Sequence, residues 1–466
     1  MRNYEECLTP AWETSTHDVV INNICNSLGY KRICLSVDYC YAVNDIVASV
    51  LILLFKIPKI LVLSLKNDIR SLRLFDINIG RGINEYVITN SKDARFNFNF
   101  FGYKTILKSI IFYVRIKNKM KQKKVGFVLG GDEAYLEFSI AAQLAEIYNI
   151  PSTFLKGYAP LKACSYKKNL MNSLPLYENY PTLFEELKNK EDLINKTTDI
   201  LEKRVNGDRS SLQYMPKYIK LKEYNESYLS SVWIFLHDFY DSPGIYGGNI
   251  FASHCDWLEY TVKYLNRYGV KIVIKRHPNE RPLNVEIIEK YKKRFKTSVI
   301  WCEEDISIDQ IKNLECKGIV TVYGTVIVEG TYAGIPVVAA GRSPYSGFDV
   351  CYMASDIKEY NKYLNLIGIG EKLQIKSKEV ALKAECANRF LDVSDSNANI
   401  PYDDIDKNFW EYCGLGIYHE NNYKRKETFL RNKNVKECVE KYLKTINIAS
   451  VLNIEKYAYS VYWDGK

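Results

Sequence analysis

Lysine, arginine and histidine follow one another at positions 275–277, directly after the short apolar run VKIVIK. Lys275 and Arg276 could neutralise the charge of a phosphate group. His277 could donate to a phosphoryl oxygen or protonate a leaving group, and Pro278 would end the strand and fix the turn that aims the imidazole. An ordinary capped strand end is the alternative, so the meaning of the pattern depends on what the fold brings beside it.

A second segment, VTVYGTVIVEGTYAG, has the pattern of a strand, a glycine turn and a helix start. After Tyr323 and Gly324, the hydroxyl of Thr325 could cap the helix and donate to a phosphate. A helix N-terminus attracts anions through its free N–H groups and its dipole. Glu329 lies one turn further on, where a carboxylate could accept from ribose hydroxyls; a plain surface position is the alternative.

The segment FLHDFYDSPGIYGG repeats this arrangement, because His237 follows an apolar run and precedes a polar loop that contains Asp241. In open α/β sheets, ligands bind beyond the carboxyl ends of the strands. We therefore expect His237, His277 and Thr325 to converge on one sheet edge. The chain has five histidines, and two of them stand at such positions, which favours a functional role for the pair.

The elements that must position these residues are short apolar runs alternating with helical patterns, which predicts an α/β fold with parallel sheets. The second half has the order β-α-β-α-β-β-α-β, typical of a doubly wound unit. Its predicted strands are 232–237, 270–275, 298–302, 317–324 and 335–341. From residue 356 onward the pattern is polar and helical.

The first half has predicted strands at 31–38, 60–65, 125–131 and 151–158. Its most apolar run, 46–65, is interrupted by Lys56, Pro58 and Lys59. Because a membrane span needs about 20 apolar residues, we expect a buried helix, a turn at IPK and then a core strand. The charged stretch 183–228 is expected to hold helices that bridge two domains.

A pair of carboxylates, Asp132 and Glu133, follows the predicted strand VGFVLGG and opens a helix. A carboxylate there could deprotonate an acceptor hydroxyl, and complementing the helix dipole is the alternative. Asp132 is the first choice as general base, with Glu133 left open. Gly157 and Tyr158 are expected to shape the floor of this half.

The composition is that of a globular protein, with 466 residues of which 47% are hydrophobic and 26% charged; this excludes a disordered chain. The net charge of +9 suits an anionic ligand or a membrane surface and gives no reason to expect nucleic acid as a partner. The 12 scattered cysteines, without a CxxC pair, indicate a reduced, cytoplasmic protein, and the N-terminus lacks the apolar segment of a secretory signal. No zinc-type cluster or DxD element at a strand end is present, so we expect neither metal nor cofactor.

Residues 104–124 could face a membrane. Apolar residues at helical spacing are followed here by a lysine-rich end, and a basic amphipathic helix can lie on anionic lipid. A core-packed helix with a solvated lysine tail is the alternative and the favoured interpretation. Attachment would be to the inner-membrane surface, at its periphery.

Four segments together resemble the capsule polysaccharide biosynthesis proteins: LHDFYDSP…YGGNIFASHCDWLEYT, IVIKRHPNE, IVTVYGTVIVEGTYAGIPVVAAGRSPYS and KGYAPLKACSYKKNLMNSLP. The resemblance covers about 125–360 and is strongest from 232 to 347. These are bacterial GT-B glycosyltransferases that include Kdo transferases, and the pattern is also similar to GT-B sialyltransferases that hold a CMP-sugar. Tyr323-Gly324-Thr325 stands where many relatives carry two serines, so the nucleotide is left open.

The resemblance implies a GT-B fold of two Rossmann-like domains facing a cleft: 1–215 for the acceptor, with a helical bridge, 216–385 for the nucleotide-sugar, and a helical tail at 386–466. It implies metal-independent transfer of a sugar, such as Kdo from a CMP donor, to a lipid-linked or oligosaccharide acceptor. His277 would contact the phosphate with Thr325 as its hydroxyl partner. The alternatives are a polyol-phosphate transferase of teichoic-acid type and a non-catalytic GT-B-like subunit of the capsule machinery.

Overall fold

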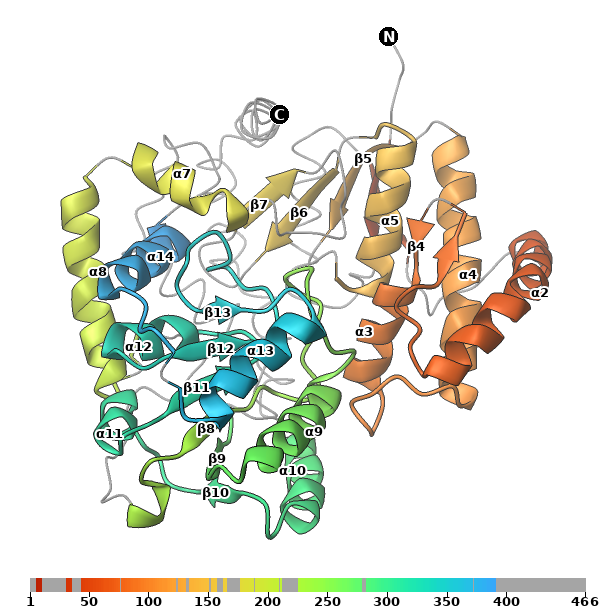
Figure 1. Cartoon of the computed structure of the whole chain (residues 1–466). Coiled ribbons are helices and arrows are strands. Elements are labelled where there is room, and N and C mark those ends of the chain that lie inside the picture. The colour runs from red at the N-terminus through yellow and green to blue at the C-terminus, as the bar shows by residue number, and fades with distance from the viewer. Residues whose placement is uncertain are drawn as a thin grey trace, which may run out of the picture. The chain divides into compact units, whose positions relative to one another are not determined.

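The computed structural model describes the chain in segments that together hold two compact units (Figure 1). The described residues are 6–10, 31–35, 43–75, 77–122, 125–130, 134–150, 152–156, 162–165, 177–187, 189–208, 210–211, 225–278, 282–371 and 373–390. Unit 1 holds those within Met1–Tyr86 and Asn97–Met171, and unit 2 holds those within Val87–Phe96 and Asn172–Leu391.

Unit 1 is built on a five-stranded sheet of order β2-β1-β5-β6-β7, parallel except for the antiparallel pairing of β6 with β7. Its strands are β1 (Glu6–Pro10), β2 (Lys31–Leu35), β5 (Val125–Gly130), β6 (Ser152–Lys156) and β7 (Lys162–Ser165). A small hairpin pairs β3 (Arg73–Leu74) with β4 (Ile77–Asn78). The helices are α2 (Val43–Lys66), α4 (Phe100–Lys121), α5 (Leu136–Ile147) and the start of α3 (Gly80–Asn90), whose residues from Val87 onward belong to unit 2.

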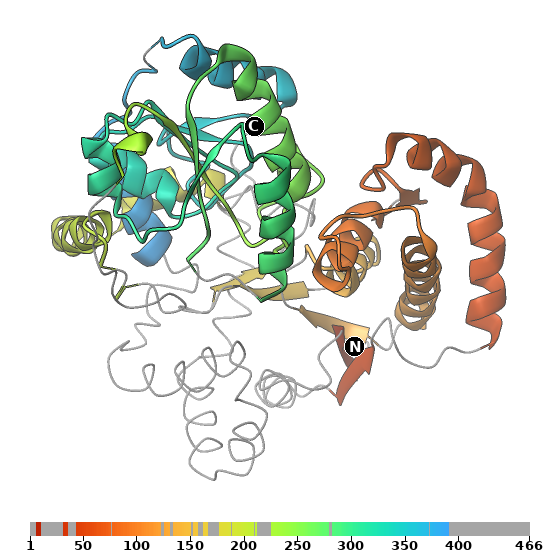
Figure 2. The same ribbon diagram turned by 90° about the horizontal axis from the view of Figure 1, so that it is seen from below.

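The helix α2 corrects the prediction for the apolar run 46–65. Residues 60–65 are not a core strand, because a single helix of 24 residues continues through Pro58. A short apolar run cannot be assigned to strand or helix by periodicity alone. Pro58 is exposed, and Figure 2 shows α2 bent into an arch, the usual response of a helix to an internal proline. Among the described residues, α2 alone is long and apolar enough to cross a bilayer, by length and composition.

The helix α4 confirms the expected helix at 105–124 in its core-packed form. Asn99 caps it, since its side chain accepts from the Gly102 N–H at 3.0 Å. Ile106, Ile110 and Val114 are buried, which satisfies the apolar face within the protein. At the lysine-rich end, Lys121 is exposed and Lys117 and Lys119 are half-buried.

Unit 2 holds a six-stranded parallel sheet of order β10-β9-β8-β11-β12-β13. The strands are β8 (Val232–Phe235), β9 (Ile272–Lys275), β10 (Ile300–Cys302), β11 (Gly318–Thr321), β12 (Val337–Ala339) and β13 (Tyr352–Met353). The helices are α7 (Tyr180–Glu186), α8 (Lys190–Val205), α9 (His254–Leu265), α10 (Pro282–Arg294), α11 (Ile308–Asn313), α12 (Val326–Ala333), α13 (Ile357–Gly368) and α14 (Lys378–Phe390), with 3-10 turns at Glu226–Tyr228 and Asn266–Tyr268.

Side chains of this sheet alternate between two buried cores, as the two-residue period of a strand requires. Val232 and Ile234 pack with α9, α10 and α13. Trp233, between them in sequence, packs with α8, α11, α12 and α14. Helices therefore cover both faces, and the strands read as continuous apolar runs because both sides are buried.

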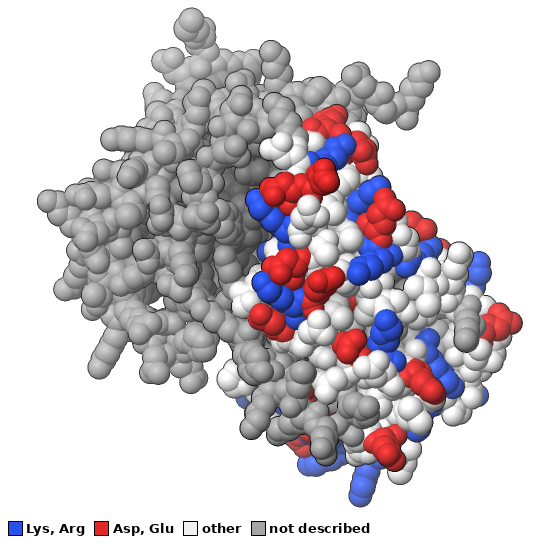
Figure 3. All heavy atoms as spheres, turned by 90° about the vertical axis from the view of Figure 1, so that its left-hand side faces the viewer, with Lys and Arg blue, Asp and Glu red and all other residues white. Residues whose placement is uncertain are grey.

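The helices α7 and α8 lie within unit 2, whereas the sequence had placed them with the first domain, before a boundary at residue 215. Arg204 of α8 explains the placement, because its guanidinium is buried against Glu329 of α12 and Glu385 of α14. The outer face over α8 carries charges of both signs (Figure 3), including the i,i+4 pair Lys203–Asp199.

The predicted class, α/β with two Rossmann-like units, is confirmed by these two largely parallel sheets and their helices. The predicted strands at 31–38, 125–131 and 151–158, and all five in the second half, are present within a few residues of their expected bounds. Of the predicted helical tail at 386–466, the end of α14 is described, and residues 391–466 lie outside the described residues.

Candidate functional site: the β8–β11 strand ends

The order of the unit 2 sheet has a switch point between β8 and β11. From β8 the chain proceeds to β9 and β10 on one side, and β11, β12 and β13 follow on the other. Loops after two such neighbouring strands diverge and leave a crevice at their carboxyl ends, where ligands of open α/β sheets bind. His237 follows β8, and Tyr323-Gly324-Thr325 follows β11. Three predicted site segments thus meet here, since β9, which precedes His277, pairs with β8.

His237 joins the two strand ends directly. Its Nε2 is hydrogen-bonded to the carbonyl oxygen of Tyr323. Because a carbonyl only accepts, Nε2 carries the hydrogen and the ring is the Nε2–H tautomer. Gly324 allows this closeness: its φ is +125°, and a Cβ there would lie 3.1 Å from His237 Cε1. The glycine is therefore required by both its backbone angle and the imidazole packed on it.

Three imidazoles gather around this point. The ring of His237 lies 5.3 Å from that of His254 and 6.1 Å from that of His277, centroid to centroid, and stacks with both. Burial lowers the pKa of His237 to about 4, against the effect of its hydrogen bond to Tyr323. Burial also lowers the pKa of His254, and the neighbouring His237 and His277 add to the shift. His237 and His254 are thus neutral at pH 7.

Tyr323 ties the imidazoles to the loop after β8. Its hydroxyl donates to the Ser242 carbonyl at 2.7 Å and lies 3.3 Å from His254 Nε2. Its ring packs edge-on against Tyr246 at 5.2 Å. The strand-end loops are therefore cross-linked by side chains before any ligand is bound.

The basic residues at the end of β9 have acidic neighbours after β10. Lys275 is buried, with its Nζ 3.9 Å from Asp305 Oδ1. Arg276 Nη1 lies 3.4 Å from Glu303 Oε2 and is half-buried. Pro278 is exposed in the turn that follows. An anion at this edge would meet these two cations.

The start of α12 after Gly324 differs from the prediction in how its first residue is bonded. Thr325 has helical backbone angles and its side chain makes no capping hydrogen bond, so the expected cap is absent. Its carbonyl oxygen accepts instead from the N–H groups of Val328 and Glu329. The hydroxyl of Thr325 is thus not engaged in capping α12, whose first turn still points its N–H groups toward the strand ends.

Two predicted donor-pocket residues have other partners in the structure. Glu329 Oε1 accepts from Nε of the buried Arg204 at 2.9 Å, which ties it to α8. Asp241 Oδ1 accepts from the Ser242 N–H at 2.9 Å and shapes the loop after β8. The predicted bases Asp132 and Glu133, and Gly157 with Tyr158, lie outside the described residues.

His254 is the member of the cluster that sequence reasoning missed. It opens α9, is almost fully buried, and its Nδ1 has no hydrogen-bond partner among the described residues. The sequence offered two signals for it. The chain has only five histidines, and His254 directly follows the N-cap residue Ser253, whose Oγ accepts from the Asp256 N–H. Among the described residues, no group of three or more His, Cys, Asp or Glu side chains is placed to hold a metal ion.

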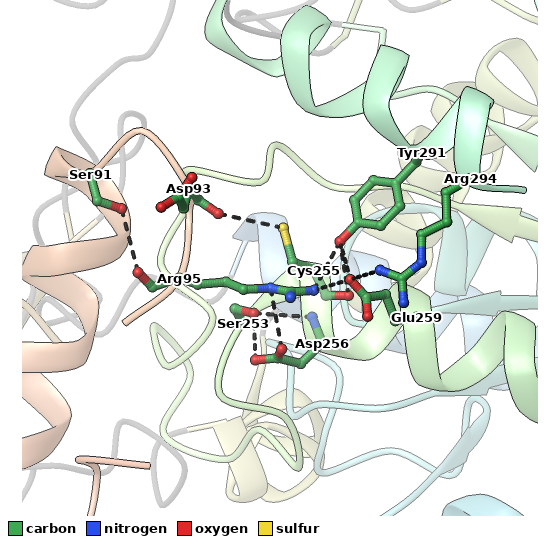
Figure 4. Close-up of polar contacts among 9 residues, drawn as sticks. All are labelled: Ser91, Asp93, Arg95, Ser253, Cys255, Asp256, Glu259, Tyr291 and Arg294. Atoms are coloured by element: carbon green, nitrogen blue, oxygen red, sulfur yellow. Dashed lines mark hydrogen bonds and ion pairs between the residues drawn. The ribbon is translucent and has the colours of Figure 1, made fainter. Parts of the chain in front are cut away.

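A polar cluster around Arg95 holds the helix that carries His254 (Figure 4). Arg95 Nη2 donates to Tyr291 Oη at 2.9 Å and to Glu259 Oε1 at 2.5 Å, and Nε forms an ion pair with Asp256. Arg294 Nη1 lies 2.6 Å from the same Glu259 oxygen. Through Arg95, the segment Val87–Phe96 packs with α9 and α10 and thus belongs to unit 2.

Comparison with known proteins found similar chains among solved structures. No protein-family model matches it, and no curated protein matches it. Among solved structures it is similar to the β-Kdo 2,4 transferase of Thermosulfurimonas dismutans KpsC, at 15% identity over 56% of this chain and 79% of that one, with a TM-score of 0.32. It is also similar to the UDP-GlcNAc 2-epimerase of Methanocaldococcus jannaschii, at 10% identity over 81% and 97% with a TM-score of 0.27. Acinetobacter baumannii MurG is matched at 13% identity over 82% and 94% with a TM-score of 0.24. At these values the likeness assigns neither substrate nor residue roles.

Proposed function

We propose that the protein is a cytoplasmic glycosyltransferase of bacterial capsule or O-antigen assembly. It would transfer a sugar, such as Kdo or a similar acidic sugar from a CMP donor, to a lipid-linked glycan at the inner membrane. The observation that carries the proposal is the β8–β11 switch point, where His237, His277 and the start of α12 meet at one sheet edge. The resemblance of these segments to capsule glycosyltransferases supports it further.

In this proposal, unit 2 binds the phosphate of the donor. Lys275 and Arg276 supply positive charge, and the N–H groups at the start of α12 add the helix dipole. His277 donates to a phosphoryl oxygen. Neutral, stacked imidazoles at His237 and His254 hold the strand ends and leave no fixed charge of their own at the crevice.

The reaction would be a displacement at the anomeric carbon. The acceptor hydroxyl oxygen forms a bond to that carbon as the bond to the phosphate oxygen breaks, and the nucleotide leaves with the electron pair. The hydroxyl proton passes to a carboxylate, for which Asp132, or else Glu133, is the candidate. Basic residues around the phosphate stabilise the leaving group, so the proposal includes no metal ion.

Nucleotide binding and transfer test the proposal in two steps. Thermal unfolding with CMP, CDP and UDP is expected to show stabilisation by one of them, since a ligand at about 100 times its Kd adds about 2.7 kcal/mol. His277→Ala and Arg276→Ala are expected to weaken that binding by at least about tenfold. Arg267→Ala is the matched control, because this exposed arginine lies in the turn before β9, at the opposite end of the strand.

Transfer from a panel of CMP- and UDP-sugars then identifies the donor. Undiminished transfer by His277→Ala would contradict the phosphate site. Release of CMP from a CDP-polyol, without transfer from any nucleotide-sugar, would identify a polyol-phosphate transferase instead. Absence of stabilisation by any nucleotide would favour the non-catalytic subunit.

A further inference from the structure

The helix α2 has more exposed large apolar side chains than any other described element. More than half of the large apolar side chains that are exposed in the described residues lie on it: Val43, Ile46, Val47, Val50, Leu51, Leu54, Phe55, Ile57, Leu61, Val62 and Leu65. Apolar patches of such extent on a soluble protein mark a surface that binds something.

These side chains form a continuous stripe. Residues three or four apart lie on one face of a helix. One such series in α2 is apolar and exposed at every position: Val43, Val47, Val50, Leu54, Ile57, Leu61 and Leu65. Ser49, Ile60 and Leu63 are buried, and α2 packs against α4. One side of α2 is therefore anchored to unit 1, and the other is apolar with nothing described covering it.

The charges beside this stripe are almost all positive. The helix α4 carries six basic residues and no acidic one: Lys104, Lys108, Arg115, Lys117, Lys119 and Lys121. The helix α2 contains three lysines, Lys56, Lys59 and Lys66, and a single acidic residue, Asp45.

An aromatic side chain joins the apolar and basic parts of this surface. Phe75 is exposed, and the Nζ atoms of Lys56 and Lys117 lie 5.7 and 4.9 Å from its ring centroid. Lysines that run along apolar surface and end in charge are suited to the boundary between lipid chains and headgroups.

We propose that α2 is a membrane-docking helix that lies in the interfacial region of an anionic lipid bilayer, with the basic residues of α4 against the headgroups. The length agrees, because 24 residues span about 36 Å and interfacial helices commonly have 20–30 residues. The packed side of α2 and its bend (Figure 2) favour a helix lying on the bilayer over one that crosses it. The proposal concerns unit 1 alone and holds whether or not unit 2 binds a nucleotide.

Vesicle co-sedimentation of the full chain tests this proposal. We expect binding to phosphatidylcholine vesicles containing about 30% phosphatidylglycerol, weaker binding to phosphatidylcholine alone, and loss of that difference when salt is raised from about 0.1 M to about 1 M. The triple variant Leu51→Gln, Leu54→Gln, Leu61→Gln is expected to lower the partition coefficient by at least about tenfold. These three side chains are more than half exposed, so the substitutions leave the buried positions of α2 unchanged.

The matched control replaces three equally exposed apolar residues of unit 2, by Leu283→Gln, Ile369→Gln and Ile375→Gln. It is expected to bind vesicles like the wild type. Thermal stabilisation of the α2 variant by a nucleotide measures separately whether unit 2 still binds its ligand. Failure of lipid binding can therefore be distinguished from failure of the proposed function.

Three results would overturn the proposal. The first is equal binding of the wild type and the α2 variant to vesicles. The second is resistance of the bound protein to alkaline carbonate extraction, which would make α2 a spanning helix. The third is absence of vesicle binding; a dimer seen by analytical ultracentrifugation and lost in the α2 variant would then assign the stripe to a second copy of the chain.

Discussion

Two polar clusters in unit 2 include residues that lie only a few positions apart around the start of α12. One cluster is neutral and the other is ionic. Tyr323 and Gly324 hold the imidazoles of His237 and His254, which burial keeps neutral. Glu329 joins a buried ionic network, in which Arg204 Nη1 lies 2.6 Å from Glu385 Oε1. The imidazole cluster thus presents polar groups without fixed charge, whereas the helices α8, α12 and α14 carry paired, permanent charges.

The two clusters differ in the charged partners that surround each buried group. Burial by itself would lower the pKa of the Arg204 guanidinium, but the carboxylates of Glu385 and Glu329 outweigh it and the pKa is raised. Burial would likewise raise the pKa of Glu385, but Arg204 and Arg389 lower it. For His237 the order is reversed: burial lowers its pKa more than the hydrogen bond to Tyr323 and the carboxylate of Asp238 raise it. We infer that the ionic network holds the scaffold and that the imidazole cluster is available to a ligand.

The largest expected effect follows from breaking the ionic network. Arg204→Met should lower the free energy of unfolding by about 3–5 kcal/mol, because it removes the buried guanidinium that Glu329 and Glu385 share and leaves Glu385 with Arg389 and Tyr345. Urea denaturation measures it. Lys203→Met, at the preceding position but on the exposed side of α8, should leave the free energy of unfolding nearly unchanged. Equal losses in the two variants would contradict the scaffold role.

Adding a methyl group at the imidazole cluster should have the next largest effect. Gly324→Ala combines a φ that side chains rarely adopt with a Cβ 3.1 Å from His237, and should cost about 1–3 kcal/mol of stability. Gly370→Ala is the control, since Gly370 has φ +78° and open space around its Cβ position. Urea denaturation should show the larger loss for Gly324→Ala, and nucleotide binding should weaken only in that variant.

The neutral imidazoles also predict a pH dependence. A histidine whose folded pKa is about 4 and whose ordinary pKa is 6.5 binds more protons in the unfolded chain between these values. Stability is therefore fully present above pH 6.5 and falls as the pH drops toward 4, by up to about 1.4 kcal/mol per pH unit for each such histidine. Urea denaturation across this window should show a shallower slope for His237→Asn, and an unchanged slope would contradict the neutral state.

The smallest expected effect separates the two clusters in binding. Glu329→Gln should change nucleotide affinity by less than about twofold, because its carboxylate is held by Arg204, whereas His277→Ala should lower it by at least about tenfold. Isothermal titration calorimetry compares them. A large loss of affinity in Glu329→Gln would restore the predicted ribose contact and place Glu329 in the donor pocket.

Much of unit 2 could be predicted from sequence, because each strand there is a short apolar run bounded by turn residues. The sequence also predicted that His237 and His277 lie close together, since the carboxyl ends of parallel strands lie at one edge of a sheet. The partner of Glu329 could not be predicted, because Arg204 and Glu385 are distant in sequence and any carboxylate one turn into a helix has the same local pattern. His254 was missed for a related reason, since it opens a helix and follows no strand.

The sequence by itself determined the alternation of strands and helices, the parallel sheets and the placement of basic and imidazole side chains at strand ends. These depend on local periodicity and on the rule that successive βα units wind in one direction. Only the tertiary structure decided which apolar segment is covered: α4 is packed inside unit 1, whereas the more apolar α2 has its stripe exposed. Burial depends on what a helix packs against, and no property of its own sequence specifies that partner.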